Sequence, residues 1–267
     1  MNKPVYLGQI NFTNCLPVNY CFQKWAIEGI ILKNGHPALI NSLMQEGKLH
    51  VAPVSSLEYL LNKDKYTLID NLCISSDGEA GSVILFSNYE FSELSGKKIG
   101  VPHTSYTSIA LLRILLEKYE VKNAQFINHQ YETSLHEALK DKYDAVLYIG
   151  DPALVANIKD TGKKYDLGKL WKEITGYPMV FGTWAALSAW KESNEDDFSQ
   201  INLLLTKAVA NGLGIYFNEI INLASSGLNL DKAHIRHYLT KNIRYEFSEK
   251  HRESLDLFKT LHTRKSK

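Results

Sequence analysis

The sequence predicts an α/β fold in which one α/β domain is interrupted by the insertion of a second. Short apolar runs alternate with helical patterns through the first two thirds of the 267 residues, and this alternation is typical of βαβ units and a mostly parallel sheet. From about residue 194 the apolar spacing is helical only. A polar break at residues 87–98 and an aromatic-rich extended run at 175–190 separate these regions, so the chain is expected to leave one domain and later return to it.

The predicted strands are short apolar runs, each followed by polar or turn-forming residues, as expected in βαβ units. In chain order they are "VYLGQI" (5–10), "IILKN" (30–34), "LHVAPV" (49–54), "YTLID" (66–70), "SVILFS" (82–87), "KIGVP" (98–102), "AQFIN" (124–128) and "YDAVLYIG" (143–150). The last third contributes amphipathic helices, one of which follows a capping Asp231.

These patterns define two lobes. We expect a discontinuous α/β lobe of residues 1–88 and 183–267, which includes the C-terminal helices, and an inserted α/β lobe of residues 89–182. Ligands of open α/β sheets bind beyond the carboxyl ends of the strands. The active site is therefore expected in the cleft between the lobes, lined by the loops that follow the strands.

Composition excludes several classes of partner. Thirty basic and 29 acidic residues give a net charge of +1, without the basic excess that nucleic-acid binding requires. No run reaches the roughly 18 to 20 apolar residues of a membrane span, and the first strand follows Met1 too closely for a signal peptide. Cys15, Cys21 and Cys73 form neither a CxxC pair nor a zinc-ligand pattern. We expect a cytoplasmic protein with reduced thiols, no disulfide and no zinc.

The loops after the predicted strands are rich in hydroxyl, amide and glycine residues. Helix N-termini in such loops carry backbone N–H groups and a partial positive charge, so several of them can hold a carboxylate without many basic residues. The sequence therefore predicts a small anionic ligand. The candidate contacts in these loops are Asn14, Ser55, Ser56, Ser76, Ser82, Thr104, Ser105, Thr107, Ser108, Gly150 and Asp151.

Helix capping is the alternative explanation for several of these residues. Ser55 with Glu58 and Ser134 with Glu137 have capping-box spacing, and Asp151 before a proline has the pattern of an N-cap. Taken singly, each of these is better explained as a cap than as a ligand contact.

Two loops need separate treatment. "HTSYTS" (103–108) holds more hydroxyl groups than one cap requires, so at least one of them is expected to bind the ligand. In "SSDGEAGS" (75–82), Gly78 and Gly81 either admit a ligand close to the backbone or supply a turn between two strands. The turn is the simpler interpretation.

Several motifs, taken together, resemble one enzyme family. They are "INFTNCLP", "GHPALINSLMQEGKLHVAPVSSLEY", "LCISSDGEAGSVILFS", "GVPHTSYTSIALLRILL", "DAVLYIGDPAL", "YDLGKLWKEITGYPMVFGTWA" and "NIRYEFSEKHRESLDLF". In this order, and over almost the whole chain, they resemble the chorismate dehydratases, or MqnA proteins, of the futalosine route to menaquinone. The resemblance implies the two-lobed fold of type II periplasmic binding proteins. It also implies dehydration of chorismate to 3-[(1-carboxyvinyl)oxy]benzoate without metal or organic cofactor.

The implied reaction needs a group that takes the ring proton at C3. The loops offer Glu58, Asp77, Glu79, His103 and Asp151, and two of these are also candidate caps. A second hypothesis needs no protein base, because the enolpyruvyl carboxylate of chorismate takes the proton itself. Asn14 is then the expected catalytic residue, and its amide positions that carboxylate or the departing hydroxyl.

Two other functions stay open. The 1,4-dihydroxy-6-naphthoate synthases of the same route are relatives, but their N-terminal motif is built around Pro-Asn-Asp-Thr, whereas this chain has "TNCLP" (13–17). A small-anion solute-binding protein uses the same fold, and it would begin with a signal peptide or a lipid-attachment cysteine. The oligomeric state is left open by the sequence.

Overall fold

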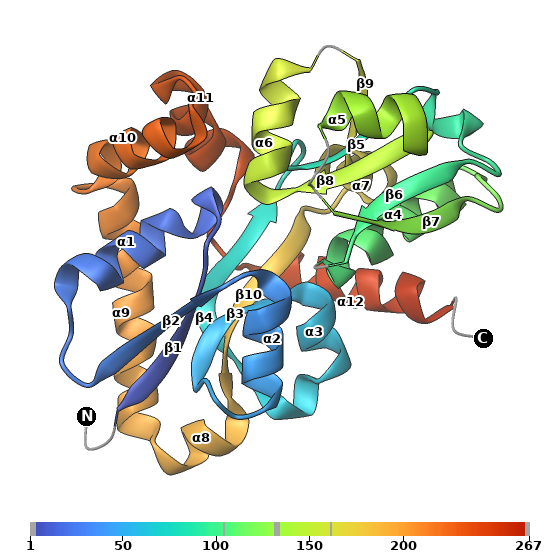
Figure 1. Ribbon diagram of the computed structural model, residues 1–267. Coiled ribbons are helices and arrows are strands. Elements are labelled where there is room, and N and C mark those ends of the chain that lie inside the picture. The colour runs from blue at the N-terminus through green and yellow to red at the C-terminus, as the bar shows by residue number, and fades with distance from the viewer. Residues whose placement is uncertain (1–3, 104, 131–133, 161, 265–267) are drawn as a thin grey trace. The chain divides into compact units, whose positions relative to one another are not determined.

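A computed structural model describes residues 4–103, 105–130, 134–160 and 162–264 (Figure 1). The chain forms two compact units. Unit 1 comprises Met1–Ser75 and Val180–Glu249, and unit 2 comprises Ser76–Met179 and Lys250–Lys267. The chain therefore leaves unit 1 after Ser75, returns to it at Val180, and leaves it again to end in unit 2.

The sheet of unit 1 has the strand order β2-β1-β3-β10-β4. Strand β1 pairs in parallel with β2 and β3, whereas β10 is antiparallel to β3. Gly8 in β1 allows close packing, because a Cβ atom there would lie 2.7 Å from the Cβ of Ala52 and 3.3 Å from Ile40 of a covering helix. The strands are β1 (Val5–Ile10), β2 (Ile30–Gly35), β3 (Val51–Ser55), β4 (Tyr66–Ser76) and β10 (Met179–Leu187).

Helices cover both faces of this sheet, with α2 and α3 on one side and α1 and α9 on the other (Figure 1). Helices α1 and α9 approach closely at Gly212, where a Cβ atom would lie 2.2 Å from the carbonyl oxygen of Pro17. The helices of unit 1 are α1 (Leu16–Trp25), α2 (Pro37–Gln45), α3 (Ser56–Leu61), α8 (Ser188–Ser193), α9 (Glu195–Leu213), α10 (Phe217–Leu228) and α11 (Lys232–His237), with a 3₁₀ turn η1 (Thr13–Cys15) before α1.

The sheet of unit 2 has the strand order β7-β6-β8-β5-β9. Strand β6 is parallel to β7 and β8, and β5 is antiparallel to β8 and β9. The strands are β5 (Val83–Ser87), β6 (Lys98–Pro102), β7 (Gln125–His129), β8 (Ala145–Ile149) and β9 (Lys163–Asp166), and the helices are α4 (Tyr106–Lys118), α5 (Leu135–Glu137), α6 (Gly150–Lys159), α7 (Leu167–Thr175) and α12 (Glu249–Thr263).

Both sheets are mixed, which corrects the expectation of a mostly parallel sheet. The predicted extended run at 175–190 contains β10, and this strand enters the sheet of unit 1 between β3 and β4, antiparallel to β3. Strand β9 was not predicted at all. Its sequence "KKYD" has no apolar run, and Lys163 and Lys164 are exposed, because β9 lies at the edge of the sheet, next to β5.

The units also differ from the predicted lobes. Residues 76–88 lie in unit 2 rather than in the first lobe, because β5 pairs with β8 and β9. The C-terminal helix α12 lies in unit 2 as well. The indole Nε1 of Trp171 donates to the Ser254 hydroxyl at 3.1 Å, and its ring packs edge-on against Phe258.

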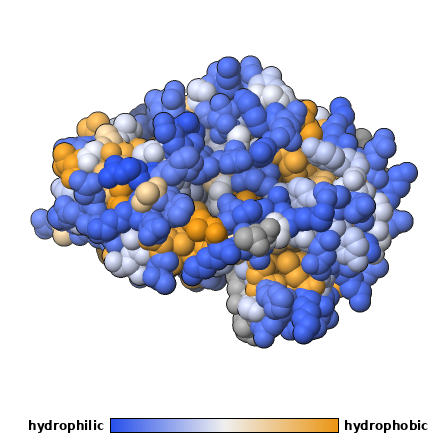
Figure 2. Space-filling view, turned by 90° about the horizontal axis from the view of Figure 1, so that it is seen from above, coloured by the Kyte–Doolittle hydropathy of each residue, from blue (hydrophilic) through white to orange (hydrophobic). Residues whose placement is uncertain are grey.

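Hydrophilic side chains cover most of the face shown in Figure 2, with smaller apolar areas between them. Within the described ranges, no helix is both long enough and apolar enough to cross a lipid bilayer.

Candidate functional site

Asn14 lies at the junction of β1 and α1, in the 3₁₀ turn η1. Its side-chain oxygen Oδ1 is buried and has no hydrogen-bond partner among the described residues. At the same junction, the Asn19 side chain donates to the Ile10 carbonyl at 2.9 Å and so ties α1 to the end of β1. A buried polar atom without a partner costs about 1–3 kcal/mol. The amide of Asn14 is therefore suited to accept a hydrogen bond from a ligand.

Ser55 and Ser56 follow β3, which ends at the same edge of the unit 1 sheet as the parallel strand β1. The Ser55 hydroxyl accepts the backbone N–H of Glu58 at 3.3 Å and the side-chain amide of Asn41 at 3.2 Å. The Ser56 hydroxyl is fully buried and donates to the Val180 carbonyl at 2.7 Å. Both serines thus contact protein groups that shape the backbone at this edge.

The loop "SSDGEAGS" is held by its own side chains and by Asp166. The Ser76 hydroxyl donates to the Gly78 carbonyl at 2.9 Å. The carboxylate of Asp166 accepts the backbone N–H groups of Ala80 at 3.0 Å and Gly81 at 2.7 Å. Asp166 was missed in the sequence as a loop-holding residue. The pattern Asp-Leu-Gly before an apolar run identifies it only as a helix cap.

Ser82, Gly150 and Asp151 are brought together in unit 2. The Gly150 N–H donates to the Ser82 carbonyl at 2.8 Å, because Val83 of β5 pairs with Ile149 of β8. Gly150 has φ +61°, a conformation that favours glycine. Helix α6 begins at Gly150, with Ile149 in the N-cap position. The N-cap interpretation of Asp151 is therefore wrong, and this residue lies in the first turn of α6.

The hydroxyl cluster at the start of α4 lies at the same edge of the unit 2 sheet. Strands β6 and β8 are parallel, so the residues that follow them emerge together. Ser105 is in the N-cap position of α4, but its side chain does not cap the helix; its hydroxyl donates to that of Ser108 at 2.9 Å. Thr107 and Ser108 are buried. Thr104, another predicted contact, lies outside the described residues.

Glu58, one of the candidate bases, is held by three neighbouring side chains. Its carboxylate accepts from the Tyr66 hydroxyl at 2.8 Å, the Gln45 amide at 2.8 Å and the Asn62 amide at 3.1 Å. The predicted capping box with Ser55 is therefore only half present, since the Glu58 side chain contacts these three groups. By contrast, both halves of the predicted box of Ser134 and Glu137 are formed.

The other acidic candidates in the loop at 75–82 form ion pairs at the surface of unit 2. Asp77 contacts the ammonium of Lys172 at 2.5 Å, and Glu79 contacts that of Lys169 at 3.2 Å. His103 is exposed. All three side chains are exposed to solvent, so none of them lies in an enclosed position from which it could take a proton from a sequestered substrate.

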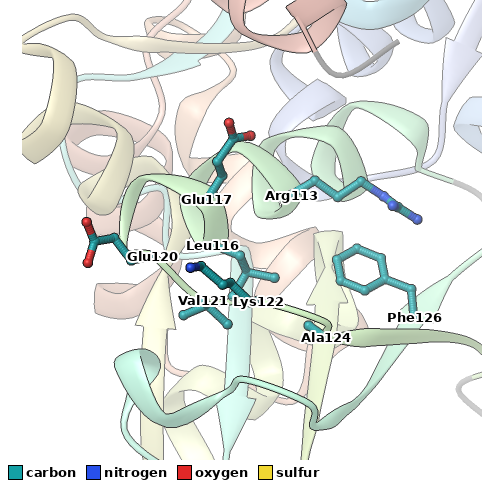
Figure 3. Close-up of a pocket in the computed structure, with 8 residues that line it drawn as sticks. All are labelled: Arg113, Leu116, Glu117, Glu120, Val121, Lys122, Ala124 and Phe126. Atoms are coloured by element: carbon teal, nitrogen blue, oxygen red, sulfur yellow. The ribbon is translucent and has the colours of Figure 1, made fainter. Parts of the chain in front are cut away.

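A pocket of about 480 Å³ lies on unit 2, where α4 and the chain that follows it meet β7 (Figure 3). The guanidinium of Arg113 lies 4.3 Å from the ring centroid of Phe126. The lining residues are Arg113, Leu116, Glu117, Glu120, Val121, Lys122, Ala124 and Phe126. None of the predicted site residues lines this pocket, so it is separate from the candidate site.

Solved structures similar to this chain share its fold. A crystal structure of an Archaeoglobus fulgidus protein matches with a TM-score of 0.80 and 17% identity, covering 98% of each chain. The periplasmic aliphatic sulphonate binding protein SsuA of Escherichia coli matches with a TM-score of 0.70 and 13% identity, covering 99% of this chain and 88% of that one. The fold is that of the periplasmic binding proteins, in agreement with the sequence prediction.

Sequence comparison identifies the family. A chorismate dehydratase of Thermus thermophilus is 28% identical to this chain, in an alignment that covers 96% of this chain and 94% of that protein. The sequence model of the menaquinone biosynthesis family matches residues 5–263. Because this match spans nearly all of the chain, the chain belongs to the menaquinone biosynthesis family.

Proposed function

We propose that this protein is a lyase that dehydrates chorismate to 3-[(1-carboxyvinyl)oxy]benzoate in the futalosine route to menaquinone. The observation that carries the proposal is the match of the menaquinone biosynthesis family to residues 5–263, together with the likeness of almost the whole chain to a chorismate dehydratase. The motif "TNCLP", which contains Asn14, favours this reaction over that of the naphthoate synthases.

The driving force of the reaction resides in the substrate. The ring carboxylate acidifies the C3 proton through the adjacent alkene, and loss of the C4 hydroxyl then makes the ring aromatic. The protein has to orient two carboxylates, stabilise the charge that develops on the ring carboxylate, and exclude water. Uncharged hydroxyl and amide groups suit these tasks because they bind the anion without neutralising it.

Asn14 is the proposed catalytic residue. Its buried Oδ1 atom has no partner among the described residues, and an amide both accepts and donates hydrogen bonds. It can thus accept from the departing hydroxyl through Oδ1 or donate to the enolpyruvyl carboxylate through Nδ2. We assign the role of base to this substrate carboxylate. The partners of Glu58, Asp77 and Glu79 support that assignment, since each of these carboxylates is engaged elsewhere.

Ser82, Gly150, Asp151 and the hydroxyl cluster of Ser105, Thr107 and Ser108 are the proposed substrate contacts of unit 2. They gather at one edge of its sheet, as argued above from the pairing of β5, β6 and β8. For Ser56 and Ser76 we propose a role in shaping the backbone, because their hydroxyls donate to backbone carbonyls. Ser55 is proposed to act with Asn41 in the same way.

Incubation of the purified protein with chorismate tests the proposal directly. Chromatography with ultraviolet detection should show the aromatic enol ether at a rate far above that of spontaneous chorismate decay. The cyclic futalosine derivative on which a naphthoate synthase would act, incubated in parallel, should be unchanged. Chorismate binding by calorimetry without product would favour a solute-binding protein, and conversion of the futalosine derivative would favour a naphthoate synthase. Either outcome would refute the proposed reaction.

A further inference from the structure

A residue near the C-terminus holds the backbone of Asn14. The hydroxyl of Tyr245 donates to the Asn14 carbonyl at 2.9 Å, across 231 positions of sequence and within unit 1. We propose that Tyr245 is a positioning residue of the reaction, which fixes the peptide that carries the Asn14 amide. This inference rests on the proposed function, because it takes Asn14 as the catalytic residue.

The local sequence explains why this carbonyl needs a donor from elsewhere. In the turn η1 the carbonyls of Phe12 and Thr13 accept the N–H groups three residues later, from Cys15 and Leu16. The next bond of the series would come from Pro17, the second residue of α1, and proline has no N–H. The hydroxyl of Tyr245 donates to the carbonyl at this place in the series.

The segment that carries Tyr245 is itself fixed by backbone hydrogen bonds. The backbone carbonyl of Tyr245 accepts the N–H of Cys73 at 2.9 Å, and the adjacent Arg244 exchanges two backbone hydrogen bonds with Ser75. The Tyr245 side chain is only 6% exposed. Burial raises the pKa of this phenol well above its usual value, so the hydroxyl keeps its proton and acts as a donor.

The backbone and the side chain of Asn14 thus differ in their environment. Its backbone is fixed by Tyr245, and its side-chain Oδ1 is buried without a partner among the described residues. Catalytic groups work best when their positions are set before the substrate arrives, and small displacements cost large factors in rate. A shift of the Asn14 peptide should therefore slow turnover more than it weakens binding.

Tyr245→Phe tests the inference, since it keeps the ring and removes only the hydroxyl. The matched control is Tyr66→Phe, which removes another buried hydroxyl of unit 1 together with its hydrogen bond to Glu58. Loss of one hydrogen bond corresponds to about a tenfold change, so kcat for chorismate should fall about tenfold in Tyr245→Phe, with KM changed less than about threefold. Tyr66→Phe should keep kcat within about twofold of wild type.

Two further variants separate positioning from a general loss of stability. Pro17→Ala in the Tyr245→Phe background restores an N–H three residues after Asn14, and it should recover at least about threefold in kcat. Absence of recovery, or a loss in Tyr245→Phe no larger than in Tyr66→Phe, would overturn the inference. Wild-type protein in the same assay keeps the two proposals distinct. If it forms no product, the proposed function fails, whatever the variants do.

Discussion

The carboxylate of Asp166 accepts the backbone N–H of Gly81 at 2.7 Å and thereby ties the loop before Ser82 to the start of α7. The same carboxylate accepts the N–H groups of Ala80, Gly168 and Lys169. Burial raises the pKa of Asp166, while backbone donors that include Ala80 and Gly81 act to lower it. One side chain therefore caps a helix and fixes a loop that contributes to the proposed site.

Asp166→Asn should destabilise unit 2. An asparagine keeps one acceptor but places an NH₂ group against a backbone N–H, so at least one donor loses its partner. We expect the free energy of unfolding to fall by about 2–4 kcal/mol, measured by urea denaturation. In the control Asp144→Asn, the carboxylate accepts one backbone N–H among the described residues, that of Lys98, and a loss below about 1 kcal/mol is expected. Equal losses in the two variants would contradict the special role of Asp166.

Gly168→Ala should be strongly destabilising, because its Cβ atom would lie 2.4 Å from the Ser76 hydroxyl and 2.8 Å from the Gly78 carbonyl oxygen. We expect a loss of about 1–3 kcal/mol. Gly227→Ala should have the opposite sign, since its Cβ atom would meet nothing within 4 Å and the residue is exposed in α10. A gain of about 0.5–1 kcal/mol is expected there. Thermal melting of both variants would test the difference in sign.

Asn14→Asp should lower chorismate turnover by about 100-fold or more with the fold retained. The substitution places a negative charge beside a dianionic substrate and removes the amide donor. Asn11→Asp is the matched control, because Asn11 is exposed at the same junction, and its turnover should stay within about twofold of wild type. Steady-state kinetics and circular dichroism would decide; near-normal activity of Asn14→Asp would leave Asn14 with a structural role only.

His50 should make the stability of unit 1 depend on pH. Its Nδ1 accepts the Tyr6 N–H at 3.2 Å, its ring stacks on Trp190, and burial lowers its pKa. The unfolded chain therefore takes up the proton first, and stability should fall as the pH drops below about 6.5.

His50→Asn keeps an acceptor but cannot titrate in this range. Its midpoint of urea denaturation should change less than that of wild type between about pH 7.5 and 5.5. His136→Asn, at an exposed position of α5, is the control, and its midpoint of urea denaturation should change with pH as that of wild type does. An unchanged dependence in His50→Asn would show that other groups are responsible. His129, whose pKa burial also lowers, is the next candidate.

The sequence by itself determined the strands whose apolar pattern is local, one complete capping box and the family resemblance. Strands β1 and β6 have the predicted bounds, and the capping box of Ser134 and Glu137 is formed as predicted. Each of these depends on residues a few positions apart, where side-chain periodicity and turn chemistry act directly.

Only the tertiary structure decided how distant segments pair. The insertion of β10 between β3 and β4, the polar edge strand β9 and the return of α12 to unit 2 all depend on such contacts. So do the bonds of Asp166 to Gly81 and of Tyr245 to Asn14, which join residues 85 and 231 positions apart. A backbone N–H or carbonyl is the same in every residue except proline, so the identity of its distant partner leaves no pattern in the local sequence.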